Sequence, residues 1–72
     1  AGGTLPCALN AANEVANERF RQGLCSFLDI ERTVCAVMDA TDPERVESLG
    51  QLEEVDARAR ALALAVLSEV AL

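Results

Sequence analysis

The residues in this chain that could perform chemistry lie close together near its start. Asn10, Asn13 and Glu14 stand three and four positions apart, so a helix would place all three along one edge. Such an edge could contact a ligand, or it could hydrogen-bond the backbone of a neighbouring segment and fix how the helix docks. We favour structural docking, because buried amides usually satisfy backbone groups.

The other reactive side chains do not form a catalytic set. The 72 residues include no His, and the sequence also lacks Lys and Tyr, so most acid–base and nucleophilic mechanisms lack their groups. The carboxylates cluster at 29–31, 39–42 and 53–56, and none of these clusters has EF-hand spacing. We assign them to solvated helix faces and to helix N-termini, where negative charge is stabilising. No residue is therefore predicted to be catalytic, to bind a cofactor or to bind a metal.

The three cysteines offer neither a metal site nor a disulfide framework. Cys7, Cys25 and Cys35 are widely spaced, and no CxxC pair occurs. An odd number of thiols would also leave one unpaired. We expect three small, partly buried apolar side chains in a reducing cytosol.

The composition indicates a small folded domain rather than a nucleic-acid-binding or membrane protein. Hydrophobic residues make up 51% of the chain, which excludes a disordered tail, whereas aromatic residues make up only 3%. The formal net charge of -6 argues against binding to nucleic acid and to an anionic membrane. The apolar run from Ala61 to Leu67 is too short to cross a bilayer, and no signal peptide is visible at the start.

Hydrophobic periodicity predicts an all-α fold, a small helical bundle with three main helices plus one short helix. The first helix is predicted from Leu5 to Gln22, with Thr4 as its N-cap and Gly23 as the residue that ends it. The second is predicted from Phe27 to Ala40, with Ser26 opening a capping box. The predicted buried stripe of the first helix is Leu5, Ala8, Leu9, Ala12, Val15, Ala16 and Phe20.

The remainder of the chain is predicted as a polar connection, a short helix and a last helix. The connection covers Thr41 to Glu47. Ser48 caps the short helix, and Gln51 reaches back to complete a capping box. Asp56 then caps the last helix, which is predicted from Ala57 to about Val70.

The last helix has no polar face over two turns. Ala61 to Leu67 is apolar at every position, and a helix that is hydrophobic all round is surrounded on several sides. Three neighbouring elements would barely provide this cover in so small a domain. The sequence therefore predicts either a central helix or a surface docked onto protein that this chain does not contain.

Three motifs, taken together, resemble a known enzyme family. The first stretch, GGTLPCALNAANEVANERF, contains LNAANE from Leu9 to Glu14. The other two motifs are F-x-DI at Phe27, Asp29 and Ile30, and D-A-x-A-R at Asp56, Ala57, Ala59 and Arg60. Their order and spacing resemble the C-terminal region of 1-deoxy-D-xylulose 5-phosphate reductoisomerase across nearly the whole chain.

The resemblance implies that residues 1–72 are the C-terminal helical domain of a larger enzyme, whose nucleotide-binding and catalytic domains are absent here. Members of the family convert 1-deoxy-D-xylulose 5-phosphate to 2-C-methyl-D-erythritol 4-phosphate in the non-mevalonate pathway of isoprenoid biosynthesis. They use NADPH and a divalent metal (Mg, Mn or Co). The resemblance also implies a homodimeric parent in the bacterial cytoplasm, or in a plastid. The domain itself is implied to support the catalytic domain of the same parent chain, without activity of its own.

Two other interpretations of the same residues stay open at this point. The chain could be a free-standing acidic helical interaction module, with the apolar last helix as its docking face. It could also be a self-associating fragment that buries this helix in a dimer. In the family interpretation, Asn10, Asn13 and Glu14 pin the first helix against neighbouring backbone.

Overall fold

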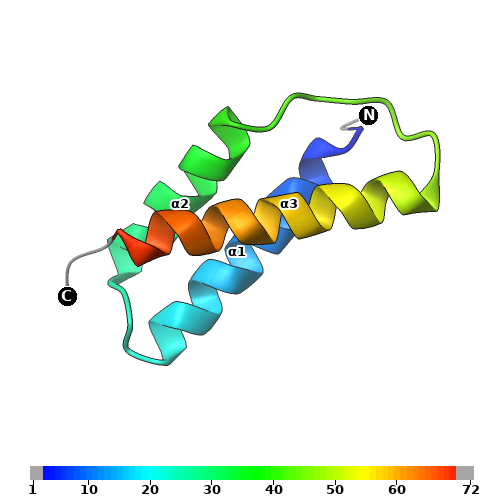
Figure 1. Cartoon of the computed structure of the whole chain (residues 1–72). Helices are drawn as coiled ribbons and strands as arrows, with labels where there is room; N and C mark the ends of the chain where they lie inside the picture. The colour runs from blue at the N-terminus through cyan, green and yellow to red at the C-terminus, as the bar shows by residue number, and fades with distance from the viewer. Residues whose placement is uncertain (1–2, 70–72) are drawn as a thin grey trace.

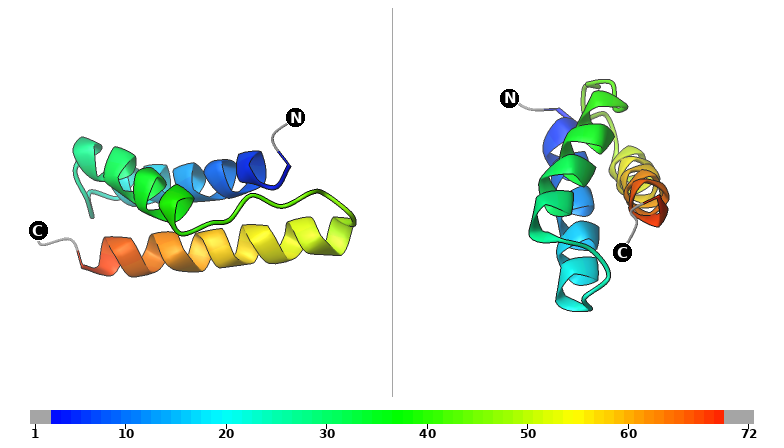
Figure 2. Two further views of the ribbon diagram at one scale, coloured as in Figure 1. Left: turned by 90° about the horizontal axis from the view of Figure 1, so that it is seen from above. Right: turned by 90° about the vertical axis from the view of Figure 1, so that its left-hand side faces the viewer.

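Residues 3–69, which the computed structural model describes, form three α-helices (Figure 1). Helix α1 spans Leu5–Arg21, α2 spans Phe27–Asp39 and α3 spans Leu49–Ser68. Helix α2 runs back along α1, and the extended connection 40–48 carries the chain to the far end of the bundle (Figure 2). Helix α3 therefore runs in the same general direction as α1, and each helix contacts both others. The predicted all-α helical bundle is confirmed.

Small side chains form the core of the bundle. The main cluster contains no side chain larger than that of Val, and its members are Ala8, Ala11, Ala12, Val37, Val55, Ala59 and Ala63. Alanines at the crossing points let the helices approach closely, so an added methyl group would push them apart. The core is tightly packed but small in volume, and it depends on the alanine face of α1.

The turn between α1 and α2 is held by contacts between residues close in sequence. Gly23 has φ +76°, a conformation that glycine adopts without strain. Ser26 is the N-cap of α2, and its Oγ accepts a hydrogen bond from Asp29 N–H at 3.3 Å. The Asp29 carboxylate accepts from both Ser26 N–H and Ser26 Oγ–H, each at 2.8 Å. The capping box stands where the sequence predicts it. Helices α1 and α2 end at Arg21 and Asp39, one residue before their predicted limits.

The predicted short helix is not a separate element, because it forms the first turns of α3. Ser48 caps this helix, and its Oγ accepts from Gln51 N–H at 3.0 Å. The prediction that Asp56 caps a new helix is wrong: the backbone is helical on both sides of it, and its carboxylate accepts from Arg60 Nε at 2.8 Å. A glycine such as Gly50 costs a helix about 1 kcal/mol, which packing of the following turns against α1 offsets.

Gln51 differs from its predicted role in the same region. Its side-chain oxygen accepts from Glu47 N–H at 2.7 Å, rather than from the N–H of the N-cap residue. It therefore orders the end of the connection instead of completing a capping box. The predicted end of the last helix, at Val70, lies outside the described residues.

Thr4 occupies the N-cap position of α1 but does not cap the helix with its side chain. Its dihedrals (φ -88°, ψ -11°) are already helical, whereas a capping side chain needs an extended N-cap backbone. Thr4 Oγ1 instead accepts from Glu44 N–H at 3.1 Å, and Thr4 N–H donates to the Glu44 carbonyl oxygen at 3.0 Å. The fully buried Thr4 thus ties the start of α1 to the connection 40–48.

Candidate docking site

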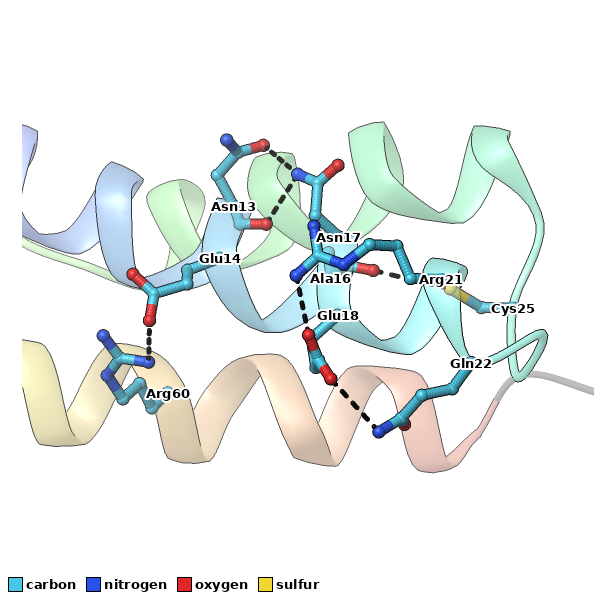
Figure 3. A network of polar contacts seen from close by, with 9 residues as sticks. All are labelled: Asn13, Glu14, Ala16, Asn17, Glu18, Arg21, Gln22, Cys25 and Arg60. Atoms are coloured by element: carbon cyan, nitrogen blue, oxygen red, sulfur yellow. Dashed lines mark hydrogen bonds and ion pairs between the residues drawn. The ribbon is translucent and has the colours of Figure 1, made fainter.

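The predicted polar edge of α1 divides between two surfaces of the bundle. Glu14 points toward α3, where its Oε1 accepts from Arg60 Nη1 at 3.3 Å. Asn13 points away from α3 (Figure 3). Asn10, Asn13 and Glu14 are all exposed in this chain, so none of them contacts buried backbone within it. Helical spacing brings the three residues to one side of α1. Because α3 lies beside Glu14 only, Glu14 contacts α3 and Asn13 does not.

Asn13 belongs to a short row of amides along α1. Asn17 Nδ2 donates to the Asn13 carbonyl oxygen at 2.8 Å and to Asn13 Oδ1 at 3.0 Å. The bond to Oδ1 orients the Asn13 side chain. Its amide nitrogen points away from the bundle in Figure 3. Asn13 is exposed, so this nitrogen is accessible to solvent.

The amide row lies on a wider uncharged surface, which we call the outer face of α1. Its members recur at intervals of three and four residues, and they are Pro6, Leu9, Asn10, Asn13, Asn17 and Phe20. None of them is charged, although 25% of the chain is. Charge depletion with retained aromatic and amide groups is typical of the core of a protein interface. The outer face of α1 therefore has the composition of a docking surface rather than that of a solvated one.

Two residues of this face correct the sequence prediction. Leu9 and Phe20 were predicted in the buried stripe of α1, but they are 45% and 40% exposed. The helices α2 and α3 pack instead on the alanines of α1, because small side chains allow the closer approach. Hydrophobicity alone does not distinguish which apolar residues of a helix face this bundle and which face another part of a protein.

An open hollow of about 640 Å³ lies between α1 and α3, with Val15 and Leu64 among its lining residues. Four of its charged residues form two ion pairs, Arg21–Glu18 and Arg60–Glu14. Arg21 Nη2 lies 2.6 Å from Glu18 Oε2, and Arg60 bridges α3 and α1. The hydrogen bond that Arg60 donates to Asp56 and, second, the one that it donates to Glu14 raise the pKa of Arg60, so the guanidinium stays charged. The hollow therefore contains an ion pair that joins α1 and α3, and the paired groups are not available as reactive groups.

The groups that could bind metal or react as nucleophiles are dispersed. Within residues 3–69, no three His, Cys, Asp or Glu side chains gather to hold a metal ion. Burial and the charge of Asp29 raise the pKa of Cys25, whose Sγ donates to the Ala16 carbonyl oxygen at 3.8 Å. A protonated, buried thiol is a poor nucleophile. Cys7 is half-buried, whereas Cys35 is exposed and not the partly buried residue that the sequence predicts.

A second exposed apolar surface, missed from the sequence, lies at the turn between α1 and α2. We call it the apolar corner; its members are Phe20, Leu24, Phe27 and Leu28. The rings of Phe20 and Phe27 meet edge to face, with centroids 5.7 Å apart. The available signal was the pair of phenylalanines flanking a glycine turn, one on each side. The helix pattern instead places Phe20 in the core and Phe27 at the start of a helix.

None of the three helices is long and apolar enough to span a membrane, within the part of the chain that the structure describes.

Comparison with known proteins identifies relatives over most of the chain. Residues 1–62 match the family described as "DXP reductoisomerase C-terminal domain". The 1-deoxy-D-xylulose 5-phosphate reductoisomerase of Methylobacillus flagellatus is 57% identical over 63 residues, which is 88% of this chain and 16% of that protein. The enzyme of the same name from Ectopseudomonas mendocina is 48% identical over 86% of this chain and 16% of its own length. The enzyme of the same name from Pelotomaculum thermopropionicum is 41% identical over 97% of this chain and 18% of its own length.

The chain spans about one sixth of the length of these relatives. No solved structure matches it. The motifs LNAANE, F-x-DI and D-A-x-A-R lie in the matched region, and the three helices match the all-α fold that the resemblance implies. The chain therefore belongs to the family of DXP reductoisomerase C-terminal domains.

Proposed function

We propose that residues 1–72 are the C-terminal helical domain of a larger 1-deoxy-D-xylulose 5-phosphate reductoisomerase, and that they support its catalytic domain without supplying catalytic groups. One observation carries this proposal: proteins of that name match 82–97% of this chain, yet the match fills only about one sixth of their length. The exposed outer face of α1 and the apolar corner support it, because both have the composition of buried interfaces.

The chemistry of the parent enzyme belongs to parts of the polypeptide outside this chain. We propose that the parent converts 1-deoxy-D-xylulose 5-phosphate to 2-C-methyl-D-erythritol 4-phosphate with NADPH and a divalent metal (Mg, Mn or Co), in isoprenoid biosynthesis. The donor groups described here do not fit either cofactor, since the carboxylates are dispersed and Arg60 is bound to Asp56 and Glu14. No catalytic step is therefore assigned to them. We propose that the parent is a homodimer. We place it in a bacterial cytoplasm, with a plastid as the alternative, because the relatives are bacterial proteins.

Asn10, Asn13 and Glu14 divide the docking role in this proposal. Asn10 and Asn13 donate to backbone of the catalytic domain from the uncharged outer face of α1. Glu14 acts within the domain, where its bond to Arg60 fixes α3 against α1 at 3.3 Å. Asn10 and Asn13 determine where the domain docks, and Glu14 holds α1 and α3 in the arrangement that docks.

The test is NADPH oxidation with 1-deoxy-D-xylulose 5-phosphate and a divalent metal. It compares the full-length reading-frame product, the same protein truncated before Ala1, and the 72-residue chain. We expect activity in the full-length protein, weaker activity in the truncated one and none in the 72-residue chain. A well-folded but inactive full-length protein would contradict the proposal.

An Asn13→Ala arm of the same assay tests the docking role. This variant should lower the melting temperature of the full-length enzyme and leave turnover at low temperature intact, because the amide holds a domain and touches no substrate. The exposed Glu31 provides a control, as Glu31→Gln should change neither quantity. Unchanged melting together with reduced turnover would show that Asn13 does not dock the domain.

The second candidate function is a free-standing acidic helical interaction module. It is favoured by the exposed part of the last helix, where Leu64 is 42% exposed and Ala61 and Ala65 are also exposed. The sequence predicts that this helix is either central or docked on absent protein, and its exposed side agrees with the second possibility. Reductoisomerase activity of the full-length protein would exclude the free-standing module.

A further inference from the structure

We infer that the apolar corner is the surface on which the preceding part of the reductoisomerase polypeptide docks against this domain. The inference rests on the proposed function and names the place of contact, which lies beyond Asn10 and Asn13 at the opposite end of α1 from Thr4 (Figure 1).

The corner exposes more apolar surface than a solvated turn requires. Phe27 is 72% exposed and Leu28 is 65% exposed, and both stand in the first turn of α2. Phe20 and Leu24 add further exposed side chains on the other side of the turn. Such a cluster, unlike a single exposed Leu, marks an interaction site.

The corner is also held in one shape before any partner arrives. The edge-to-face contact of Phe20 and Phe27 orients both rings. The capping box of Ser26 and Asp29 fixes the start of α2 beneath them. Cys25 is buried in the turn and anchors it to α1. A preformed surface loses little conformational entropy on docking.

The corner differs in charge from another region of the molecule that also exposes apolar side chains. Residues 39–56, which we call the acidic segment, contain seven acidic residues and one arginine. All other residues together contain five acidic and five basic residues, so the acidic segment holds the whole net charge. Arg21 is the only charged residue between Phe20 and Leu28. An apolar, nearly neutral partner therefore meets no electrostatic barrier at the corner.

The size of the corner favours the same polypeptide over a second copy. The exposed fractions of its four side chains correspond to roughly 400 Å² of surface, taking about 200 Å² for each large side chain. A stable complex of separate molecules needs about 800 Å² from each partner. A partner on the same chain needs less, because linkage raises its effective concentration. About five sixths of the length of the relatives is available to supply that partner.

The experiment compares Phe27→Ser with Leu49→Ser in the full-length enzyme. Phe27 and Leu49 are 72% and 73% exposed, so in this domain alone the two changes remove equally accessible apolar groups. Leu49 lies in the acidic segment and serves as the matched control. The readouts are the rate at which trypsin releases the C-terminal domain and the hydrogen exchange of amides 20–28.

We expect Phe27→Ser to speed release about tenfold and to increase exchange at the corner, whereas Leu49→Ser changes neither. Leu28→Ser should act in the same direction, which keeps the test valid if Phe27→Ser misfolds. Equal effects at Phe27 and Leu49, or no effect at either, would overturn the inference. A full-length protein whose molecular mass halves in Phe27→Ser would show that the corner pairs two copies instead.

The two proposals fail in different ways in this experiment. An inactive wild-type enzyme in the NADPH assay removes the proposed function, while the difference between Phe27→Ser and Leu49→Ser still reports on docking. An active wild-type enzyme with identical release rates for the two variants removes only the inference about the corner.

Discussion

The apolar corner and the acidic segment each contain one large apolar side chain that is exposed to the same degree, Phe27 and Leu49, yet the two regions differ as surfaces. Phe27 at the corner has the exposed neighbours Phe20 and Leu28, with few charges between them. Leu49 stands in a segment where acidic residues outnumber basic ones by seven to one. If the corner is the docking surface that we propose, the exposure of one residue does not define such a surface. The composition of its neighbours does.

The two regions also differ in what holds their backbone. The corner is fixed by residues adjacent in sequence, chiefly Ser26 and Asp29. The connection within the acidic segment is fixed from a distance: Thr4 binds Glu44 across 40 positions of sequence. Gln51 Nε2 adds a bond to the Arg45 carbonyl oxygen at 2.9 Å. Local contacts therefore hold the corner, whereas the acidic segment combines local contacts with a long-range contact to the start of α1.

The largest expected effect comes from a pair of glycines, one in contact with each region. Gly3 and Gly23 both have positive φ, at 55° and 76°. A Cβ at Gly3 would collide with the Glu44 carbonyl, whereas a Cβ at Gly23 would meet open space. Gly23→Ala should cost about 1–2 kcal/mol of backbone strain. Gly3→Ala should cost about 3 kcal/mol, because it also disrupts the Thr4–Glu44 hydrogen bonds, each worth about 1 kcal/mol.

Urea unfolding followed by circular dichroism measures both glycine variants against the wild-type chain. Equal losses in the two variants would mean that the connection does not depend on its contact with the start of α1. The distinction between a locally held corner and a distantly held connection would then fail.

That distinction also explains which parts of the fold could be predicted. The pattern S-x-x-D identified the N-cap of α2, because the capping box involves only Ser26 and Asp29 and their own backbone. The role of Thr4 could not be predicted, since its partner Glu44 is far away in sequence. Asp56 resembles an N-cap in sequence, but packing of α3 against α1 continues the helix through it.

The second prediction compares the two serine N-caps. Ser26→Ala and Ser48→Ala should each cost about 1 kcal/mol at neutral pH, because each removes the hydrogen bond that the serine Oγ accepts from a helix N–H. Ser26→Ala also removes the bond that Ser26 Oγ–H donates to the Asp29 carboxylate. Only the first should change the dependence of stability on pH. The partner of Ser26 is the Asp29 carboxylate, whose pKa the Ser26 backbone and side-chain hydrogen bonds lower. The partner of Ser48 is the backbone of Gln51, which does not titrate.

The sign follows from that lowered pKa. The folded state favours ionised Asp29, so its stabilising effect is present above the unfolded pKa of about 4 and is lost as pH falls through the lower folded pKa. Ser26→Ala keeps the backbone hydrogen bond to Asp29, which is the larger cause of the lowered pKa, and removes the side-chain bond. It should therefore flatten the acid side of the stability profile in part, and Ser48→Ala should shift the profile without changing its shape. Chemical denaturation between pH 2 and pH 7 gives both curves. A profile that flattens equally in the two variants would assign the acid sensitivity to other carboxylates.

The candidate site was predictable only in part, for a similar reason. Helical spacing placed Asn10, Asn13 and Glu14 on one side of α1, but the direction of that side relative to α3 depends on the whole bundle. Glu14 therefore meets Arg60, 46 positions away, while Asn13 points outward. The exposed Phe20 shows the same limit, since hydrophobicity marks a residue that needs cover but does not identify the protein that covers it.

The smallest expected effect concerns two exposed ion pairs. Arg21–Glu18 near the corner has N···O 2.6 Å, and Arg58–Glu44 at the acidic segment has N···O 3.7 Å. Exposed pairs contribute about 0.2–1 kcal/mol. By geometry Arg21→Gln should be the more harmful change. We expect the reverse at low salt, because Arg58→Gln removes a positive charge that lies beside the acidic segment and pairs with its Glu44. The acidic segment carries a net charge of -6, so its self-repulsion should increase. Unfolding measured at low salt and at about 1 M salt tests this, since screening shortens the Debye length to about 3 Å and should remove the difference. A larger loss of unfolding free energy for Arg21→Gln at low salt would show that the geometry of the ion pair outweighs the surrounding charge. The uneven distribution of charge would then contribute little to the difference in stability between the two regions.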